Sequence, residues 1–231
     1  LKGKSFSFKD RPYLLPLYRD THSHIIVVKG RQMELTEWMV NWLLQNLTTY
    51  RDTIGLYTAP RADQVSRFSR DRMRKAIKES PVLRHNLETA RKEEGKEAIS
   101  HIPFSNGSLL YLYSAWGDFD AIRNIPADFI AIDEMQDVQA EAIPVIESAM
   151  SHSKHGKIIM VGTASESGSQ FDQLWQLSDM KEWDAQAQAW IVHKPENQMY
   201  SGYHFSQEMA PWINTLPPSD PNSTEAKRLR W

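Results

Sequence analysis

Short apolar runs recur along the chain and alternate with segments whose apolar residues are spaced as on a helix. Strand-like runs lie at 25–28, 53–59, 129–132, 157–162 and 189–192. Such runs, rich in β-branched and aliphatic residues, are typical of strands buried on both faces. Helical spacing is predicted at 36–50, 61–92 with a break near Pro81, and 139–150. Asn106-Gly107 predicts a hairpin between strands at 97–104 and 108–114.

Strands that alternate with helices indicate an α/β fold with a mostly parallel central sheet and helices on both faces. After about Ser201 the chain becomes rich in Pro, Ser and Asn, with one predicted helical patch at 207–213. We therefore expect an α/β domain at residues 1–200. A small C-terminal subdomain and linker are expected at 201–231, leading towards a further domain that this sequence does not contain.

Charge is almost balanced over the chain, with 27 Lys and Arg against 29 Asp and Glu. This balance excludes a molecule that clamps nucleic acid over its whole surface, but it permits a local basic face. The segment 61–92 holds ten basic and four acidic residues, a net charge of +6. Three interpretations are open for it: contact with a DNA backbone, contact with an acidic neighbour, or a solvated helix.

Cysteine is absent, which excludes disulfides, thiol nucleophiles and Cys-ligated metals. No apolar run approaches the roughly 20 residues that span a bilayer. The polar start at Leu1 predicts no signal peptide, and a start other than Met suggests a piece of a longer chain.

The run at 25–28 leads through a loop to a helix that opens at Thr36, the setting of a phosphate-binding loop. The usual pattern is G-x-x-x-x-G-K-[ST]. Aligned on Thr36, the chain has Lys29 at the first Gly, Glu34 at the second and Leu35 at the Lys, so only Thr36 matches. Taken alone, this weak match favours an ordinary strand-to-helix turn.

A second candidate site follows the run at 129–132, where Asp133 and Glu134 come directly after four apolar residues. In a P-loop ATPase the first acid holds Mg²⁺, and the second orients and deprotonates the attacking water. The alternative is that Asp133 caps a helix and Glu134 is a solvated acid. A third segment, Gly162–Ser165, has small hydroxyl residues suited to sensing a γ-phosphate. The alternative is that this segment is an ordinary Gly/Ser turn with no role in catalysis.

In order and spacing these motifs resemble those of one family. The chain resembles the N-terminal ATPase domain of the large terminase subunit, the DNA-packaging motor of tailed bacteriophages, over about residues 10–215. Five segments carry the resemblance: Lys29–Met33 (phosphate loop with a basic first residue), Asp133-Glu134 (Walker B), Gly162–Ser165 (coupling motif), Ala121–Asn124 (arginine-finger segment), and Gly202–Gln207 with Pro211-Trp212 (end of the ATPase domain).

The resemblance implies a P-loop NTPase of the ASCE type and a set of site residues. Those implied to bind nucleotide are Lys29, Gly30, Arg31, Gln32, Met33, Glu34, Leu35, Thr36, Tyr13 and Thr163. Thr36 and Asp133 would hold Mg²⁺, and Glu134, Arg123 and Arg31 would be catalytic. Tyr13 stands near the family's adenine motif, but the Gln of that motif is missing, and a core position is the alternative.

A second departure from the family pattern concerns the phosphate loop, where Glu34-Leu35 replaces the usual Gly-Lys before Thr36. Glycine permits close backbone approach to phosphate, and the Lys supplies positive charge. Our hypothesis is that Lys29 and Arg31 provide this charge and that Glu34 points away from the phosphate.

The resemblance implies an ATP hydrolase that couples Mg-ATP hydrolysis to translocation of double-stranded DNA into a procapsid. Implied partners are the portal protein, the small terminase subunit and further copies in a ring, expected to be a pentamer, in the host cytoplasm and without a membrane. No nuclease activity is expected, since the chain has no room for the family's nuclease domain. The alternatives are a helicase-like DNA or RNA ATPase and a nucleotide-binding assembly module with weak hydrolysis.

Overall fold

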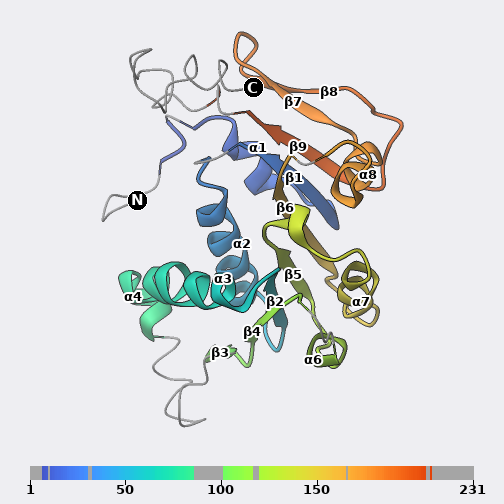
Figure 1. Cartoon of the computed structure of the whole chain (residues 1–231). Helices are drawn as coiled ribbons and strands as arrows, with labels where there is room; N and C mark the ends of the chain where they lie inside the picture. Colours follow the sequence, from blue (N-terminus) through green and yellow to red (C-terminus); the bar gives the residue numbers. More distant parts are fainter. Residues whose placement is uncertain are drawn as a thin grey trace.

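A computed structural model describes residues 7–9, 11–30, 33–85, 101–116, 120–164, 166–206 and 209. Its centre is a nine-stranded sheet in the order β3-β4-β2-β5-β6-β1-β9-β7-β8 (Figure 1). The strands are β1 (His24–Lys29), β2 (Ile54–Ala59), β3 (His101–Pro103), β4 (Leu109–Ser114), β5 (Phe129–Ile132), β6 (Lys157–Thr163), β7 (Lys181–Asp184), β8 (Ala189–Val192) and β9 (Ser201–Phe205).

The sheet is parallel from β4 through to β7, and only the edge strands β3 and β8 pair antiparallel. This confirms the mostly parallel sheet expected from the sequence. β6 lies between β1 and β5, as the additional strand of the ASCE class does. The carboxyl ends of these three parallel strands therefore meet at one edge of the sheet, where open α/β folds bind their ligands.

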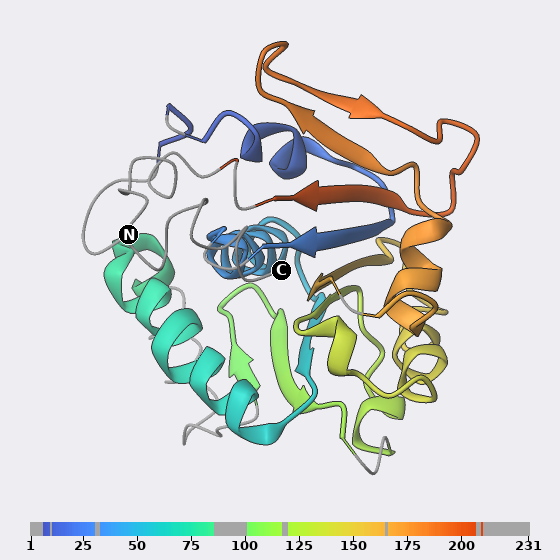
Figure 2. The same ribbon diagram turned by 45° about the horizontal axis from the view of Figure 1, so that its top comes forward.

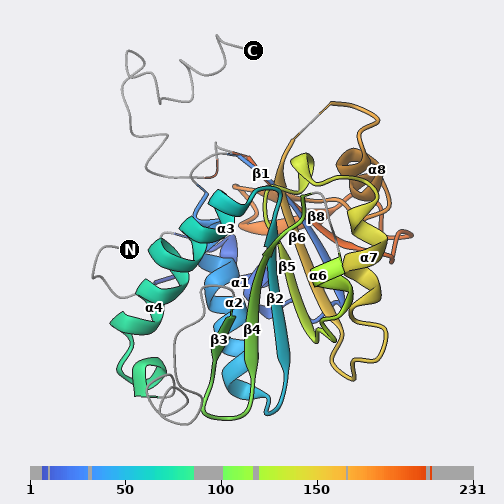
Figure 3. The same ribbon diagram turned by 60° about the horizontal axis from the view of Figure 1, so that its bottom comes forward.

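Helices cover both faces of the sheet, as the sequence predicts (Figures 1 and 3). α1 (Leu14–Arg19), α2 (Leu35–Thr49), α3 (Ala62–Arg67), π-helix η1 (Phe68–Met73) and α4 (Arg74–Glu79) cover one face. α6 (Asp120–Arg123), α7 (Ala142–Ser148) and α8 (Gln170–Gln176) cover the other, and the 3₁₀-helix η2 (Met135–Asp137) follows β5. No helix in the described ranges is long and apolar enough to cross a membrane.

Each face of the sheet carries its own buried core, which explains why the central strands lack hydrophobic–polar alternation. In β1, Ile25 and Val27 belong to the core under α2, whereas Ile26 and Val28 belong to the core under α7. Successive side chains of a strand point to opposite faces, so a strand covered on both sides is apolar throughout.

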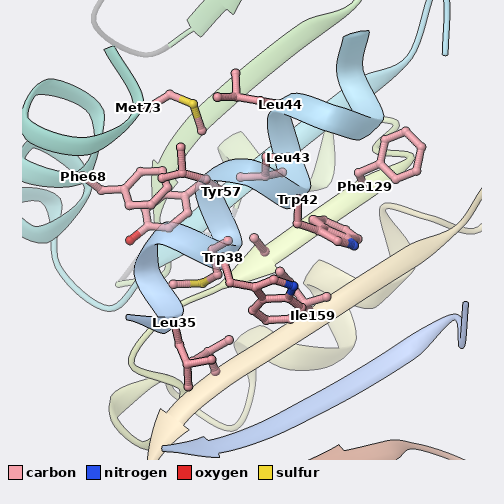
Figure 4. Close-up of a cluster of buried hydrophobic side chains, with 14 of the residues drawn as sticks. Leu35, Trp38, Trp42, Leu43, Leu44, Tyr57, Phe68, Met73, Phe129 and Ile159 are labelled. Atoms are coloured by element: carbon pink, nitrogen blue, oxygen red, sulfur yellow. The ribbon is translucent and has the colours of Figure 1, made fainter. Parts of the chain in front are cut away.

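The core under α2 includes several large aromatic side chains, among them Trp38, Trp42 and Phe129 (Figure 4). The Tyr57 ring stacks on Phe68, with 3.6 Å between ring centroids, and joins β2 to η1. Trp42 of α2 meets Phe129 of β5 edge-on at 6.0 Å. These contacts fix α2 and η1 against the strands whose ends form the candidate site.

Sequence reasoning located most of the central strands but missed β9. Its Gly202, Tyr203 and Phe205 are buried, and it lies between β1 and β7 (Figure 2). The sheet thus continues past residue 200, where we expected the domain to end. The helical patch expected at 207–213 lies outside the described residues apart from Met209, as do 97–100 of the expected strand and 86–92 of the expected helix.

Turn signals in the sequence are confirmed. Gly107 has φ +85°, which only glycine adopts readily, and it closes the β3–β4 hairpin. The helical segment that starts at Ala62 ends at Glu79, with Ser80 extended immediately before Pro81. Proline disfavours helical backbone in the residue that precedes it, which explains the break.

Candidate active site

The amino group of Lys29 joins the end of β1 to the end of β5. Its Nζ lies 2.9 Å from Asp133 Oδ1 and 3.4 Å from Glu134 Oε1. Only 12% of the Lys29 side chain and 11% of the Asp133 side chain is exposed, so the pair is largely withdrawn from water. Residues that lie about 100 positions apart in the sequence thus form one charged group.

Asp133 is held by further contacts around its carboxylate. The backbone N–H of Glu134 donates to Oδ1 at 2.9 Å, and the Tyr57 hydroxyl donates to Oδ2 at 3.4 Å. Burial, reinforced by the negative charge of Asp133, raises the pKa of Tyr57 well above its usual value. Tyr57 therefore stays protonated and remains a donor to Asp133 at physiological pH.

Glu134 adopts a left-handed backbone conformation with φ 50° at the start of η2. Its Oε1 accepts from Lys29, and its Oε2 accepts from Gln136 Nε2 at 2.8 Å. The other end of the Gln136 amide, Oε1, accepts from the backbone N–H of Thr163 at 2.9 Å. Gln136 was not among the residues predicted from the sequence, and its position two residues after Glu134 was the only available signal.

Some side chains of the phosphate-loop segment point into the core, and others point towards the cleft. Met33 and Leu35 are buried in the core under α2, so only their backbone groups can face a nucleotide. Thr36, in the first turn of α2, lines the cleft beside Asp133 and Glu134. The N–H of Gly30 donates to Phe205 O at 2.7 Å and ties the start of the loop to β9. Arg31 and Gln32 lie outside the described residues.

Glu34 occupies the position of the second Gly in the usual phosphate-loop pattern, and its φ of 58° is left-handed. Glycine takes that conformation without strain, which explains the usual preference. The Glu34 carboxylate forms two hydrogen bonds with the Arg11 guanidinium, that from Nη2 being 2.9 Å long. Arg11 thus neutralises the charge that would otherwise oppose a phosphate.

A cleft of about 620 Å³ opens over Thr36, Asp133 and Glu134. Its opposite wall is the continuous helical segment α3–η1–α4, which contributes Arg67, Asp71, Arg72 and Lys75, together with Gln64 and Phe68. Part of the basic run noted in the sequence therefore lines this cleft.

Ion pairs involve two side chains of the helical segment α3–η1–α4, here called the basic wall. Arg72 Nη1 lies 2.9 Å from Glu37 Oε1 of α2, and Lys75 Nζ lies 3.8 Å from Glu79 Oε1. In the middle of the segment, Phe68 and Met73 lie five positions apart in the sequence and are both buried. That spacing fits the wider turn of a π-helix, a feature frequent at functional sites.

Three other predicted site residues lie away from the cleft lining. Tyr13 is 2% exposed and packs edge-on against Trp183 and Phe205, so its ring offers no free face for adenine stacking. Burial, then the charge of Glu34, raises its pKa to about 12. Arg123 is exposed on α6. Thr163 ends β6 and contacts the site through Gln136.

The carboxylates suit a cation that takes most of its ligands from elsewhere. Among the residues that the structure describes, no three His, Cys, Asp or Glu side chains are grouped as in an all-protein metal site. Mg²⁺ is commonly held by one or two carboxylates together with substrate phosphates and water. Asp133 and the Thr36 hydroxyl, both in the cleft lining, fit that pattern.

Taken together, the ASCE strand order, the Lys29–Asp133–Glu134 group and the cleft over Thr36 define a P-loop ATPase. Residues 15–189 match the family model described as phage terminase large subunit gpA, ATPase domain. The chain belongs to this family, so it is a phage terminase ATPase domain and an ATP hydrolase. No curated protein sequence matches the chain.

Solved structures share the fold at low sequence identity. The large terminase of bacteriophage HK97 has a TM-score of 0.69 at 13% identity, over 98% of this chain and 47% of that one. The Thermus phage P74-26 large terminase ATPase domain has a TM-score of 0.61 at 15% identity, over 96% and 92%. The large terminase of a thermophilic bacteriophage, in complex with ADP, gives 0.63 at 11%, over 96% and 49%. The chain thus spans about half of the HK97 protein and of this thermophilic-phage protein.

Proposed function

We propose that this chain binds Mg-ATP in the cleft over Thr36 and hydrolyses it to drive double-stranded DNA into a procapsid. The observation that carries the proposal is the ion-paired group of Lys29, Asp133 and Glu134, which joins the phosphate-loop strand to the Walker B strand. Complexes of the thermophilic-phage large terminase with ADP and ATP-γ-S support nucleotide binding in this fold.

Each residue of the group has one role in the proposed reaction. Asp133 and Thr36 would hold Mg²⁺, which when bound neutralises charge on the phosphates. Glu134 accepts a proton from water as the water oxygen attacks the γ-phosphorus and the bond to the β–γ bridging oxygen breaks. Lys29, whose Nζ contacts both acids, offsets one of their two negative charges and would also contact the phosphates.

Because Leu35 stands where the usual phosphate loop has Lys, other residues must supply positive charge to the phosphates. Lys29 contacts Asp133 and Glu134 of the cleft lining, and Arg72 and Lys75 line the opposite wall. Arg31 stays a predicted contributor, since it lies outside the described residues. Charge-assisted contacts to phosphate are strong, so these cations replace the Lys whose position Leu35 occupies.

The packaging context supplies the remaining proposals. Arg123, exposed on α6 and absent from the lining of its own cleft, would act on the nucleotide of a neighbouring copy in a ring. A ring of five copies would engage DNA, the portal protein and the small terminase subunit in the host cytoplasm. Family membership supports a packaging role more than the helicase-like or assembly-module alternatives.

Substitution of Glu134 by Gln tests the proposed reaction. The amide keeps the size of the side chain but cannot accept the proton, so we expect ATP turnover to fall by about 100-fold or more. Binding of ATP-γ-S, measured by calorimetry with Mg²⁺, should persist. Undiminished turnover would remove Glu134 from the mechanism.

Glu141→Gln is the matched control, because Glu141 is exposed seven residues further on and does not line the cleft. It should turn over ATP at the wild-type rate. If the unsubstituted chain bound no nucleotide at millimolar Mg-ATP, the proposed function would be overturned.

A further inference from the structure

The Gln136 side chain joins the carboxylate of Glu134 to the end of β6. Its Nε2 donates to Glu134 Oε2 at 2.8 Å, and its Oε1 accepts from the N–H of Thr163 at 2.9 Å. Nε2 also lies 3.3 Å from Asp137 Oδ2. An amide is suited to this position because it offers a donor at one end and an acceptor at the other.

The approach of Gln136 to β6 depends on Gly162. A Cβ atom at residue 162 would lie 2.8 Å from Gln136 Oε1 and 2.9 Å from Phe171 Cε1, closer than such atoms normally come. Gly162 therefore leaves the space into which the amide fits. The last residues of β6 and the Gln136 side chain form one fitted contact.

We propose that Gln136 is a positioning residue that fixes the Glu134 carboxylate relative to the end of β6, and so transmits the position of the segment after β6 to the catalytic base. The inference rests on the proposed role of Glu134 in ATP hydrolysis. It assigns to one side chain the physical link between the Walker B strand and the strand that ends at Thr163.

The contacts of Glu134 explain why this link affects the reaction. Lys29 Nζ lies 3.4 Å from Glu134 Oε1. Gln136 Nε2 donates to Oε2 over a shorter distance, 2.8 Å, and so constrains the direction of the carboxylate. A base displaced by about 1 Å from its water costs on the order of 100-fold in rate. A shift of Thr163 therefore changes turnover through Gln136.

Two substitutions of Gln136 test the proposal. Gln136→Glu keeps the length and can still accept from Thr163, but it offers no N–H donor to Glu134. Gln136→Met loses both contacts at similar size. We expect kcat for ATP to fall about tenfold or more in both, with KM, the Kd for ATP-γ-S and the melting temperature close to wild type.

Gln139→Glu, with the same change of charge three residues further on, is the control and should keep the wild-type kcat. Gly162→Ala provides a further variant, since the added methyl group meets the Gln136 amide and the Phe171 ring and changes no charged side chain. It should also lower kcat while leaving ATP-γ-S affinity unchanged.

The outcomes separate this inference from the proposed function. If Glu134→Gln abolishes turnover while both Gln136 variants keep the wild-type kcat, the positioning role is wrong and the base assignment stands. A joint loss of kcat, ATP-γ-S affinity and melting temperature in both Gln136 variants would show a structural role and overturn the inference. If Glu134→Gln itself turns over normally, the proposed function fails first.

Discussion

At the scale of single residues, Glu34 shows how a charged residue can replace glycine in a phosphate loop. Its left-handed φ of 58° is a conformation that costs a non-glycine residue about 1–2 kcal/mol. The two hydrogen bonds from Arg11 offset part of that cost and neutralise the carboxylate. The sequence hypothesis that Glu34 avoids the phosphate agrees with this pairing, but the role of Arg11 was not foreseen.

Comparison of Glu34→Gly with Glu34→Ala isolates the backbone strain, because both variants lose the ion pair. We expect the Gly variant to be the more stable by about 1 kcal/mol, since glycine alone relieves the left-handed conformation. Urea unfolding of the two variants measures this difference. Equal stability, or a more stable Ala variant, would mean that Glu34 is unstrained in the folded chain.

At the scale of elements, the sequence did not decide the function of the basic wall, the helical segment α3–η1–α4. Ten basic residues at 61–92 favoured no single interpretation, because a count of charges does not say which way each side chain points. The segment also contains the π-helix η1, which no periodicity in the sequence predicts. In the structure Arg67, Arg72 and Lys75 line the nucleotide cleft.

Two lysines of α4 provide a matched test of this wall. Lys75 lines the cleft, whereas Lys78, one turn later and also exposed, does not. We expect Lys75→Ala to raise KM for ATP about fivefold, equivalent to roughly 1 kcal/mol. Steady-state ATPase assays at low salt measure the effect.

Lys78→Ala, the control, should leave KM within experimental error. If both substitutions instead weaken DNA binding and neither changes KM, the wall serves DNA rather than the nucleotide.

At the scale of the whole molecule, the sequence predicted the central sheet and the charged ends of β1 and β5, because buried parallel strands are continuous apolar runs. The sequence did not predict strand β9, because its residues, Ser201-Gly202-Tyr203-His204-Phe205, include polar residues and glycine and do not form an apolar run. Gly202 is needed there because a Cβ would lie 2.2 Å from Ser178 Oγ. The sequence did not predict Gln136 as a site residue, because its contacts depend on β5 and β6 being neighbours in the sheet, which only the fold shows.

A polar network around Asp20 holds β9 to the rest of the sheet. Asp20 Oδ2 accepts from Tyr203 Oη at 2.7 Å and from the Ser201 hydroxyl, and Oδ1 accepts from the backbone N–H of His22 at 2.8 Å. Lys181 of β7 donates to the Ser201 hydroxyl. The segment before β1 is thereby joined to both strands that follow β1 towards this edge.

Asp20→Asn should therefore destabilise the chain at pH 7 by about 2 kcal/mol, the order of a hydrogen bond to a charged group. Burial alone raises the pKa of Asp20, but the hydrogen bonds from Ser201, His22 and Tyr203, with the charge of Lys181, lower it overall. A lowered folded-state pKa gives stability that is present above the unfolded-state pKa of about 3.9 and lost as pH falls through the folded-state value. The stability difference between wild type and Asp20→Asn, measured by urea unfolding from pH 7 to pH 3, should thus shrink below about pH 4. A difference that stays constant across this range would show that the Asp20 charge does not hold β9 in the sheet.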